Sequence, residues 1–347
     1  VAKPGDDRQI LRNLLLEATP EGLELTATDT ITGLWLKSPV SDSVVVTKPG
    51  RVVVNAVNLQ RTVDTVAHRE ITIRATERSC FIEAGGSKFR LCVEDANDFP
   101  RIARFSQRKP YITIKAELLP KMIARTAHCA HDEASFQLMH GMLVQAENNE
   151  IRMVATNGQR LAVSTLPFVD QSVESEIKSK IVIPAEATGA IKRIVSTDIE
   201  SVDIQWMTNF FNVRTQLGEV SIRALAGHYP LYQRGIPTGL GSMKLDRRSL
   251  VEVLKQTTAI KSATTSFVSL EFKRDRMIFT SHAEGAGDAE IEYEYDRSGQ
   301  DDASLTINPD FMIETLAAIR GDDVSFETGG EMTPTILREQ DNPDGLK

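Results

Sequence analysis

The sequence is poor in the residues that most often mark a catalytic or metal centre. Its three cysteines, Cys80, Cys92 and Cys129, form no CxxC pair, and its six histidines form no HExxH pattern. Walker A, GxSxG and kinase signatures are absent as well. We therefore expect no metal ion, no cofactor, no catalytic residue and three reduced, structural cysteines, as in a protein that is not an enzyme.

Long apolar runs are also missing. The longest are a few residues, too short to span a membrane, and the opening stretch VAKPGDDRQI has no apolar signal-peptide core. Hydrophobic residues make up 41% of the chain and charged residues 25%, with a mean hydropathy of −0.21. This composition predicts a globular protein of the cytoplasm with no membrane partner.

The chain has no excess of basic residues, since its net charge is −8. Aromatic residues are also few, at 6% of the chain. Few aromatics argue against single-strand nucleic acid binding. The five segments with helical periodicity, 55–67, 117–128, 186–195, 247–261 and 310–320, nevertheless carry ten basic and six acidic residues, in a chain with 40 basic and 48 acidic ones. The basic residues of any single helix are explained by an ordinary solvated face. Summed over all five segments, the excess of basic over acidic residues favours helices that face a polyanion.

The basic residues of these helices are our candidates for phosphate contacts. Such contacts would not depend on base sequence, because phosphates carry no sequence information. The candidates are Arg61, Lys121, Arg125, Lys192, Arg193, Arg247, Arg248, Lys255 and Lys261.

What the chain does contain is a repeat. An alternating strand, a polar turn and a second alternating strand occur at Leu14–Asp29, Met142–Asn157 and Val268–His282. Equivalent ends are 128 residues apart from Thr28 to Thr156 and 125 apart from Thr156 to Ser281. This interval is too long for a solenoid and fits three similar tandem domains.

A strand leading into a helix repeats in the same register, at Val52–Val66, Ile181–Val195 and Leu305–Ile319, and further copies begin at Ile112 and Met243. The pattern predicts an α+β fold with two helices packed on antiparallel sheets in each domain. We place the domains at 1–108, 109–238 and 239–347, with joints near Pro110 and Pro237–Gly241. Compared with the second, the first domain is expected to lack its opening strand and helix, and the third its last strand.

Three motifs carry a resemblance to a known family. Met153–Val163 (MVATNGQRLAV) closely resembles the VATDGHRLA segment of bacterial sliding clamps, the beta subunits of DNA polymerase III. Lys88–Pro100 (KFRLCVEDANDFP) is similar to the family segment that ends in Phe-Pro, and Gly227–Pro237 (GHYPLYQRGIP) is similar to its F-P-x-Y-x-x-x-x-P stretch. The resemblance covers essentially the whole chain, in order, and implies that the third domain also lacks the C-terminal tail of the family.

The resemblance implies a DNA-clamp fold of three similar domains and a head-to-tail homodimer that closes into a ring. It further implies a non-enzymatic processivity factor in DNA replication, which encircles double-stranded DNA and tethers the DNA polymerase III catalytic subunit. A clamp loader and other proteins with clamp-binding motifs are further implied partners.

The resemblance also implies a pocket for partner peptides and a dimer contact made by edge strands. Asn157 and Gln159 stand where the family commonly has Asp and His, and Gly235 replaces a usual apolar residue. The implied pocket residues are Met139, Thr156, Gly158, Gln159, Arg160, Leu161, Pro230 and Arg234. The implied dimer residues are Phe89 and Leu91, for which core packing is the alternative role.

Two other hypotheses remain open from the residues. One is a scaffold or adaptor that uses the same peptide pocket without encircling DNA, which loss of the basic helix faces would favour. The other is an enzyme whose catalytic groups converge from distant positions, which would require a cluster of titratable groups in one cleft.

Overall fold

The computed structural model describes residues 2, 8–66, 70–133, 138–168, 170–172, 177–195, 198–260, 267–295, 303–340 and 346. The chain divides into two compact units. Unit 1 comprises Val1–Lys121, Leu143–Glu150 and Phe168–Ala226, and unit 2 comprises Met122–Met142, Ile151–Pro167 and Gly227–Lys347.

The predicted hairpin occurs three times. The three hairpins are β1 (Asn13–Thr19) with β2 (Gly22–Thr28), β9 (Gly141–Glu147) with β10 (Glu150–Thr156), and β18 (Val268–Phe272) with β19 (Arg276–Ala283). In the second hairpin Asn148 and Asn149 both have positive φ, 55° and 57°. Asparagine tolerates this left-handed conformation, which two-residue hairpin turns require.

The predicted strand-to-helix element is present as well. Its copies are β4 (Gly50–Asn55) with α1 (Ala56–Thr65), β8 (Ile112–Lys115) with α2 (Leu118–Thr126), β13 (Ser179–Pro184) with α3 (Thr188–Ile194), β17 (Gly241–Asp246) with α4 (Arg247–Thr257), and β21 (Ala303–Ile307) with α5 (Pro309–Ala318). The N-cap side chains of Asn55, Asp246 and Asn308 each accept a backbone N–H of the first turn, which fixes where these helices begin.

Helix α4 is shorter than the sequence pattern predicts. It ends at Thr257, not at residue 261. The hydroxyls of Thr257 and Thr258 bond back to the carbonyls of Val253 and Leu254. Two adjacent β-branched residues that bond in this way are poor helix formers, which explains the early end.

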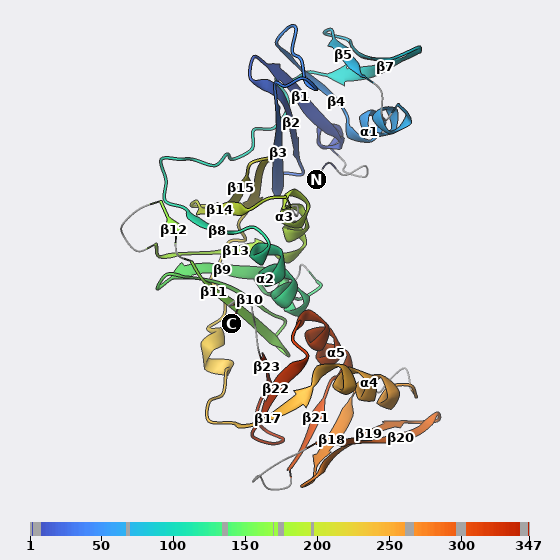
Figure 1. Ribbon diagram of the computed structural model, residues 1–347, viewed down its shortest axis with the longest axis vertical. Helices are drawn as coiled ribbons and strands as arrows, with labels where there is room; N and C mark the ends of the chain where they lie inside the picture. Colours follow the sequence, from blue (N-terminus) through green and yellow to red (C-terminus); the bar gives the residue numbers. More distant parts are fainter. Residues whose placement is uncertain are drawn as a thin grey trace. The chain divides into compact units, whose positions relative to one another are not determined.

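Unit 1 is built on one long antiparallel sheet, whose order is β12-β8-β14-β15-β16-β3-β2-β1-β4-β7-β6-β5 (Figure 1). Its remaining strands are β3 (Thr32–Pro39), β5 (Thr72–Ala75), β6 (Ser79–Ala84), β7 (Ser87–Glu94), β12 (Asp170–Gln171), β14 (Ser201–Trp206), β15 (Phe210–Thr215) and β16 (Gly218–Arg223). Strands of the first and second repeats join where β16 pairs with β3. A Cβ at Gly218 would come 2.1 Å from the carbonyl oxygen of Trp35, so this pairing requires glycine.

Unit 2 contains two smaller antiparallel sheets from the third repeat, in the orders β17-β22-β23 and β20-β19-β18-β21. The further strands are β11 (Leu161–Pro167), which neighbours β10, and β20 (Gly287–Glu294), β22 (Asp323–Thr328) and β23 (Ile336–Glu339). Helices α4 and α5 lie side by side over these sheets (Figure 1). Leu250, Leu254 and Leu316 point into a core with Phe272 and Phe326.

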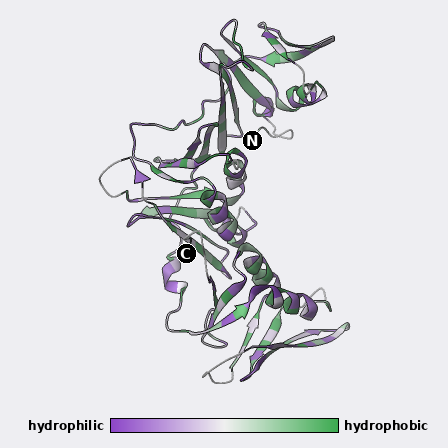
Figure 2. Ribbon diagram, in the orientation of Figure 1, coloured by the Kyte–Doolittle hydropathy of each residue, from purple (hydrophilic) through white to green (hydrophobic). Residues whose placement is uncertain are grey.

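The helices are two-sided, as Figure 2 shows by the alternation of hydrophilic and hydrophobic colours along α4. In α4, Leu250 and Leu254 are fully buried, while Arg248 and Lys255 are exposed. This is the period expected of a helix that packs on a sheet with one face.

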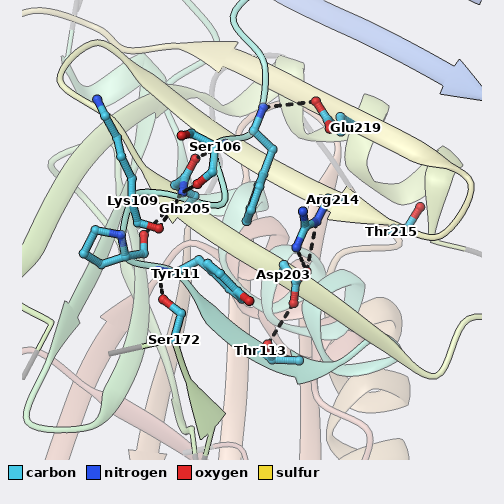
Figure 3. A network of polar contacts seen from close by, with 12 residues as sticks. Ser106, Lys109, Tyr111, Thr113, Ser172, Asp203, Gln205, Arg214, Thr215 and Glu219 are labelled. Carbon is cyan, nitrogen blue, oxygen red and sulfur yellow. Dashed lines mark hydrogen bonds and ion pairs between the residues drawn. The ribbon is translucent and has the colours of Figure 1, made fainter. Parts of the chain in front are cut away.

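The connector between the first and second repeats is fixed to the sheet of unit 1 by a buried amide (Figure 3). Gln205 of β14 is fully buried, and its Oε1 accepts the Ser106 N–H at 2.9 Å. Its Nε2 donates to the carbonyls of Ser106 and Lys109 at 2.8 and 3.1 Å. The Lys109 N–H closes the same turn onto the Ser106 carbonyl. One side chain therefore satisfies both ends of the turn.

Two stacked arginines hold the connector just before this turn. The Arg104 Nε donates to Glu219 at 2.8 Å, and its guanidinium lies 3.7 Å from the ring centre of Trp35. The Arg214 guanidinium, paired with Asp203, lies 3.9 Å from the ring centre of Phe105. Such charge-assisted and cation–π contacts orient both partners.

We predict that Gln205→Ala loosens this connector. The change leaves the buried polar groups of the 106–109 turn unpaired, at a cost of roughly 1–3 kcal/mol in the free energy of unfolding. Urea unfolding measures that loss, and limited trypsin digestion should show faster cleavage at Arg104 and Arg108. The control is Gln256→Ala on the exposed side of α4. Equal trypsin rates in wild type and Gln205→Ala would contradict the assignment.

Candidate functional site

Neither a membrane-spanning helix nor a metal centre occurs in the part of the chain that the structure describes. There, no helix is long and apolar enough to cross a membrane. The same residues contain no group of three or more His, Cys, Asp or Glu side chains placed to hold a metal ion. The three cysteines are free, with Cys80 and Cys129 buried and Cys92 exposed.

The loop that joins β10 to β11, together with the strand residue on each side of it, holds five of the eight pocket residues that the sequence predicts. Its shape is set locally, because Asn157 Oδ1 accepts the N–H groups of Gln159 and Arg160, both at 3.0 Å. The Thr156 hydroxyl donates to the Arg160 carbonyl at 2.7 Å, and Gly158 has a φ of +88°. An Asx turn with a left-handed glycine thus displays Gly158 and Gln159 to solvent.

The other three predicted residues come from two further segments of unit 2, of which the one that holds Met139 lies beside this loop. A Cβ on Gly158 would lie 3.9 Å from the Met139 sulfur, which places Met139 beside the turn. The Tyr229 hydroxyl donates to the Val154 carbonyl at 3.4 Å and so anchors the segment that holds Pro230. Arg234 follows in the short helix η5 (Tyr232–Gly235), and both Pro230 and Arg234 are exposed.

Sequence reasoning missed two residues of α5 that meet Arg160. The Arg160 Nη1 lies 2.5 Å from a carboxylate oxygen of Glu314, and the guanidinium lies 4.2 Å from the ring centre of Phe311. Phe311 and Glu314 are three residues apart, so they share one face of the helix. The spacing of Phe311 and Glu314 can be seen in the sequence. No nearby sequence pattern, however, indicates that their partner is Arg160, about 150 positions earlier.

Burial beside Arg160 shifts the titration of two neighbouring groups. The pKa of His128 is lowered by desolvation and by the Arg160 charge, against smaller opposing effects of the Ala124 carbonyl and Glu314. Burial raises the pKa of Cys129 to about 11. The His128 Nε2 lies 3.4 Å from the Thr315 hydroxyl of α5. The imidazole is therefore favoured in its neutral form.

The candidate phosphate-binding residues fall into two groups. Five are exposed on their helices, namely Arg61, Lys192, Arg193, Arg248 and Lys255. Arg248 also forms an exposed ion pair with Asp322 at 3.2 Å, a kind of contact that solvent weakens. Lys261 lies outside the described residues.

Three candidates are already engaged by ion pairs or hydrogen bonds, two of them with distant parts of the chain that sequence reasoning did not foresee. The Arg125 guanidinium forms an ion pair with Glu339 in which both side chains are about nine-tenths buried. The Arg247 Nε donates to the Gly321 carbonyl at 2.6 Å, beyond the end of α5. Lys121 pairs with Glu117 at 3.3 Å, with 13% of its side chain exposed. These three are poorly placed for phosphate.

Acidic residues line the outer sheet face of the third repeat. Along β20, Ile291 and Tyr293 pack on the core that also holds α4. The alternate residues Glu290, Glu292 and Glu294 are exposed. Because side chains alternate along a strand, these carboxylates lie on the sheet face away from that core. Within unit 2, basic helix surface and acidic sheet surface are therefore separated.

Strands β7 and β20 both present unpaired backbone edges. β7 pairs with β4 through Val93 and Glu94, so the same edge of Ser87–Cys92 has no strand partner among the described residues. β20 is the outermost described strand of its sheet. Phe89 and Leu91, our candidate dimer residues, pack their side chains on the core of the first repeat, while Lys88 and Arg90 are exposed.

Comparison with known families gives three matches in chain order. Residues 5–103 match the model of the DNA polymerase III beta subunit, N-terminal domain. Residues 113–231 match the central domain of the same subunit, and residues 236–345 match its C-terminal domain.

Individual relatives agree with these matches. The chain is 24% identical over 339 residues to the beta sliding clamp of Pseudomonas aeruginosa, covering 96% of this chain and 90% of that one. It is 26% identical to the clamp of Chlamydia muridarum, covering 95% and 88%. Among solved structures, the Bacillus subtilis sliding clamp superposes with a TM-score of 0.92 at 18% identity, covering all of this chain and 92% of that one. The P. aeruginosa beta subunit gives 0.90 at 23%, with the same coverage. These likenesses confirm the α+β clamp fold predicted from the sequence.

We predict that His128 makes stability depend on pH. Its folded-state pKa lies below the ordinary value of about 6.5, so below that pH the unfolded chain binds the proton more readily. The free energy of unfolding should therefore fall as the pH drops from 7 to 5, because protonation draws the equilibrium toward the unfolded chain. Urea unfolding across this range should give a shallower slope for His128→Gln. A slope unchanged by the substitution would contradict this account.

Proposed function

The chain belongs to the DNA polymerase III beta subunit family, and from this membership we propose that it is a sliding clamp that encircles double-stranded DNA. A closed ring needs little affinity, because topology prevents escape while weak phosphate contacts let the protein slide. The clamp would tether the replicative polymerase in the cytoplasm and give it processivity, acting as an accessory subunit and not as an enzyme.

The observation that carries this proposal is the separation of charge in a chain of net charge −8. The exposed basic side chains Lys192, Arg193, Arg248 and Lys255 lie on helices, whereas acidic side chains line the outer strand β20. A DNA duplex inside a ring would meet the helices, and the acidic sheets would repel DNA from the outside.

The open edges of β7 and β20 support a head-to-tail homodimer. The open edge of β7 covers Ser87–Cys92 and β20 has eight residues, and an unpaired edge is a template for pairing with another chain. β7 displays Lys88 and Arg90, while β20 displays Glu290, Glu292 and Glu294. Pairing β7 of one copy with β20 of the next joins opposite charges and uses a different surface on each copy, as ring closure requires.

The loop 156–161, with Met139 and Pro230, is the proposed docking site for partner peptides. Its half-buried Met139 and Leu161 and the neighbouring Leu231, which is 66% exposed, offer apolar contact to a short segment. The catalytic subunit of the polymerase, the clamp loader and other proteins with clamp-binding motifs are the proposed partners. A related clamp from P. aeruginosa was solved bound to griselimycin.

The first test of the proposed function is retention on DNA. Protein loaded onto nicked circular plasmid by its clamp loader and ATP should co-elute with the plasmid in gel filtration. It should be lost once a restriction enzyme linearises the plasmid, because a ring slides off free ends. Equal retention on circular and linear DNA would overturn the encircling proposal.

We predict that reversing Lys192, Arg193, Arg248 and Lys255 to Glu reduces retention on circular plasmid by roughly tenfold or more, since the helices would then repel phosphate. The control reverses four exposed basic side chains outside the helices, Lys48, Lys178, Lys180 and Arg274. It makes the same change in net charge. Similar losses in the two variants would show that net charge, and not the helix surface, controls retention.

We predict that charge reversal at either strand edge dissociates the dimer. Light scattering should give about twice the chain mass of 38.4 kDa for the wild type. Lys88→Glu with Arg90→Glu, or Glu290→Lys with Glu292→Lys, should each give the monomer mass, because like charges then meet. An equimolar mixture of both variants should recover the dimer, since both of its interfaces join opposite charges. Monomers in the mixture would contradict the proposed pairing.

A further inference from the structure

Arg160 is the positive charge nearest the turn of the proposed peptide site, and it is already engaged. Its Nη1 pairs with Glu314 and its guanidinium stacks on Phe311. Only 16% of the Arg160 side chain is exposed, against 52% for Glu314. The arginine is therefore largely covered, and its counter-ion stands on the solvent side of the pair.

Helix α5 holds both partners of Arg160 rigidly. Asn308 caps the helix by accepting the N–H groups of Asp310 and Phe311, and Pro309 occupies its first turn. Met312 and Leu316 anchor the opposite side in the core of the third repeat. The ring and the carboxylate are thus presented together, one turn apart, to a single guanidinium.

The Arg160 backbone is fixed as firmly as its side chain. Its N–H is bonded to Asn157 and its carbonyl accepts the Thr156 hydroxyl. Because both partners are preorganised, little side-chain entropy remains to be lost when the ion pair forms. A carboxylate on an incoming ligand would have to displace Glu314 or sit beside it, and either event is unfavourable.

A neutral segment fits this arrangement better than an acidic one. The Arg160 charge is already balanced by Glu314, so an apolar or amide-bearing side chain can pack beside the pair without leaving a second charge uncompensated.

We propose that Glu314 sets the charge preference of the peptide site, by neutralising Arg160 so that the site accepts neutral, apolar segments and disfavours acidic ones. This inference rests on the peptide-binding role proposed above. Glu314 on α5 is then a residue that determines peptide specificity, although it lies 154 residues from Arg160 in the sequence.

The test uses two fluorescein-labelled hexapeptides that share alternating leucine and phenylalanine and differ in one residue, glutamine or glutamate. Fluorescence anisotropy gives the Kd of each peptide for wild type, Glu314→Gln and Glu314→Gln with Arg160→Gln. The wild type should prefer the glutamine peptide. Glu314→Gln should shift the ratio of the two Kd values about tenfold toward the glutamate peptide, and the double variant should abolish that shift.

The matched control is Asp310→Asn, which removes one negative charge from the same helix at an exposed position. It should leave the ratio of Kd values unchanged. If both peptides bind but Glu314→Gln does not change their ratio, the inference is overturned while the peptide site stands. If neither peptide binds the wild type, the peptide-binding proposal fails and the inference falls with it.

The His128 imidazole gives a second readout that needs no peptide. Because Arg160 lowers and Glu314 raises its pKa, an NMR titration should show a lower pKa in Glu314→Gln and a higher one in Arg160→Gln. A His128 pKa that stays the same in Glu314→Gln would mean that Glu314 does not neutralise Arg160, and would overturn the inference.

Discussion

Burial of one helix face on a sheet is the constraint on which this structure depends. In α2, Leu119, Met122 and Ile123 are fully buried, and in α4 Leu250 and Leu254 are. A helix packed in this way has only its outer face free for charge, and a strand that turns alternate residues to the core has only its other face. The sequence places lysine and arginine on the helices and glutamate on the strands. Packing then separates the basic helix surface from the acidic strand surface.

Long-range pairing decides which of those charges remain available. Arg125, on α2, would be a good phosphate ligand if its surroundings were solvent, but Glu339 on β23 covers it. An ion pair this buried needs both partners, since removal of either leaves an uncompensated charge. Glu339 also accepts the N–H groups of Arg320 and Gly321, so it is held in place independently of Arg125. Structure thus removes some cations from the surface and leaves others, such as Lys192 and Arg193, free to act.

Sequence reasoning succeeded where the determining information is local. The three hairpins, the strand-to-helix elements and the Asp246 cap depend on residue periodicity and on neighbours within four positions. It failed where the partner lies far along the chain, as for Glu314, which is 154 residues from Arg160. The connector is a similar case. Its polar residues and Pro110 are typical of a loose linker, yet Gln205, 99 residues from Ser106, supplies the hydrogen bonds that fix the turn. No pattern within the connector itself encodes that partner.

The difference between a buried arginine such as Arg160 and an exposed one such as Arg248 explains how one chain could bind both DNA and partner peptides. A polyanion binds wherever cations stand exposed without strong counter-ions, and its contacts weaken as salt rises. A partner-peptide site with a free arginine would compete for that same polyanion. Pairing Arg160 with a carboxylate and an aromatic ring takes this arginine out of that competition and keeps its stiff, planar side chain as part of the site. Arg248 differs in that its pair with Asp322 is open to solvent, so a phosphate can replace the carboxylate at little cost. Burial of the arginine side chain, more than the identity of the residue, therefore assigns each arginine to a ligand.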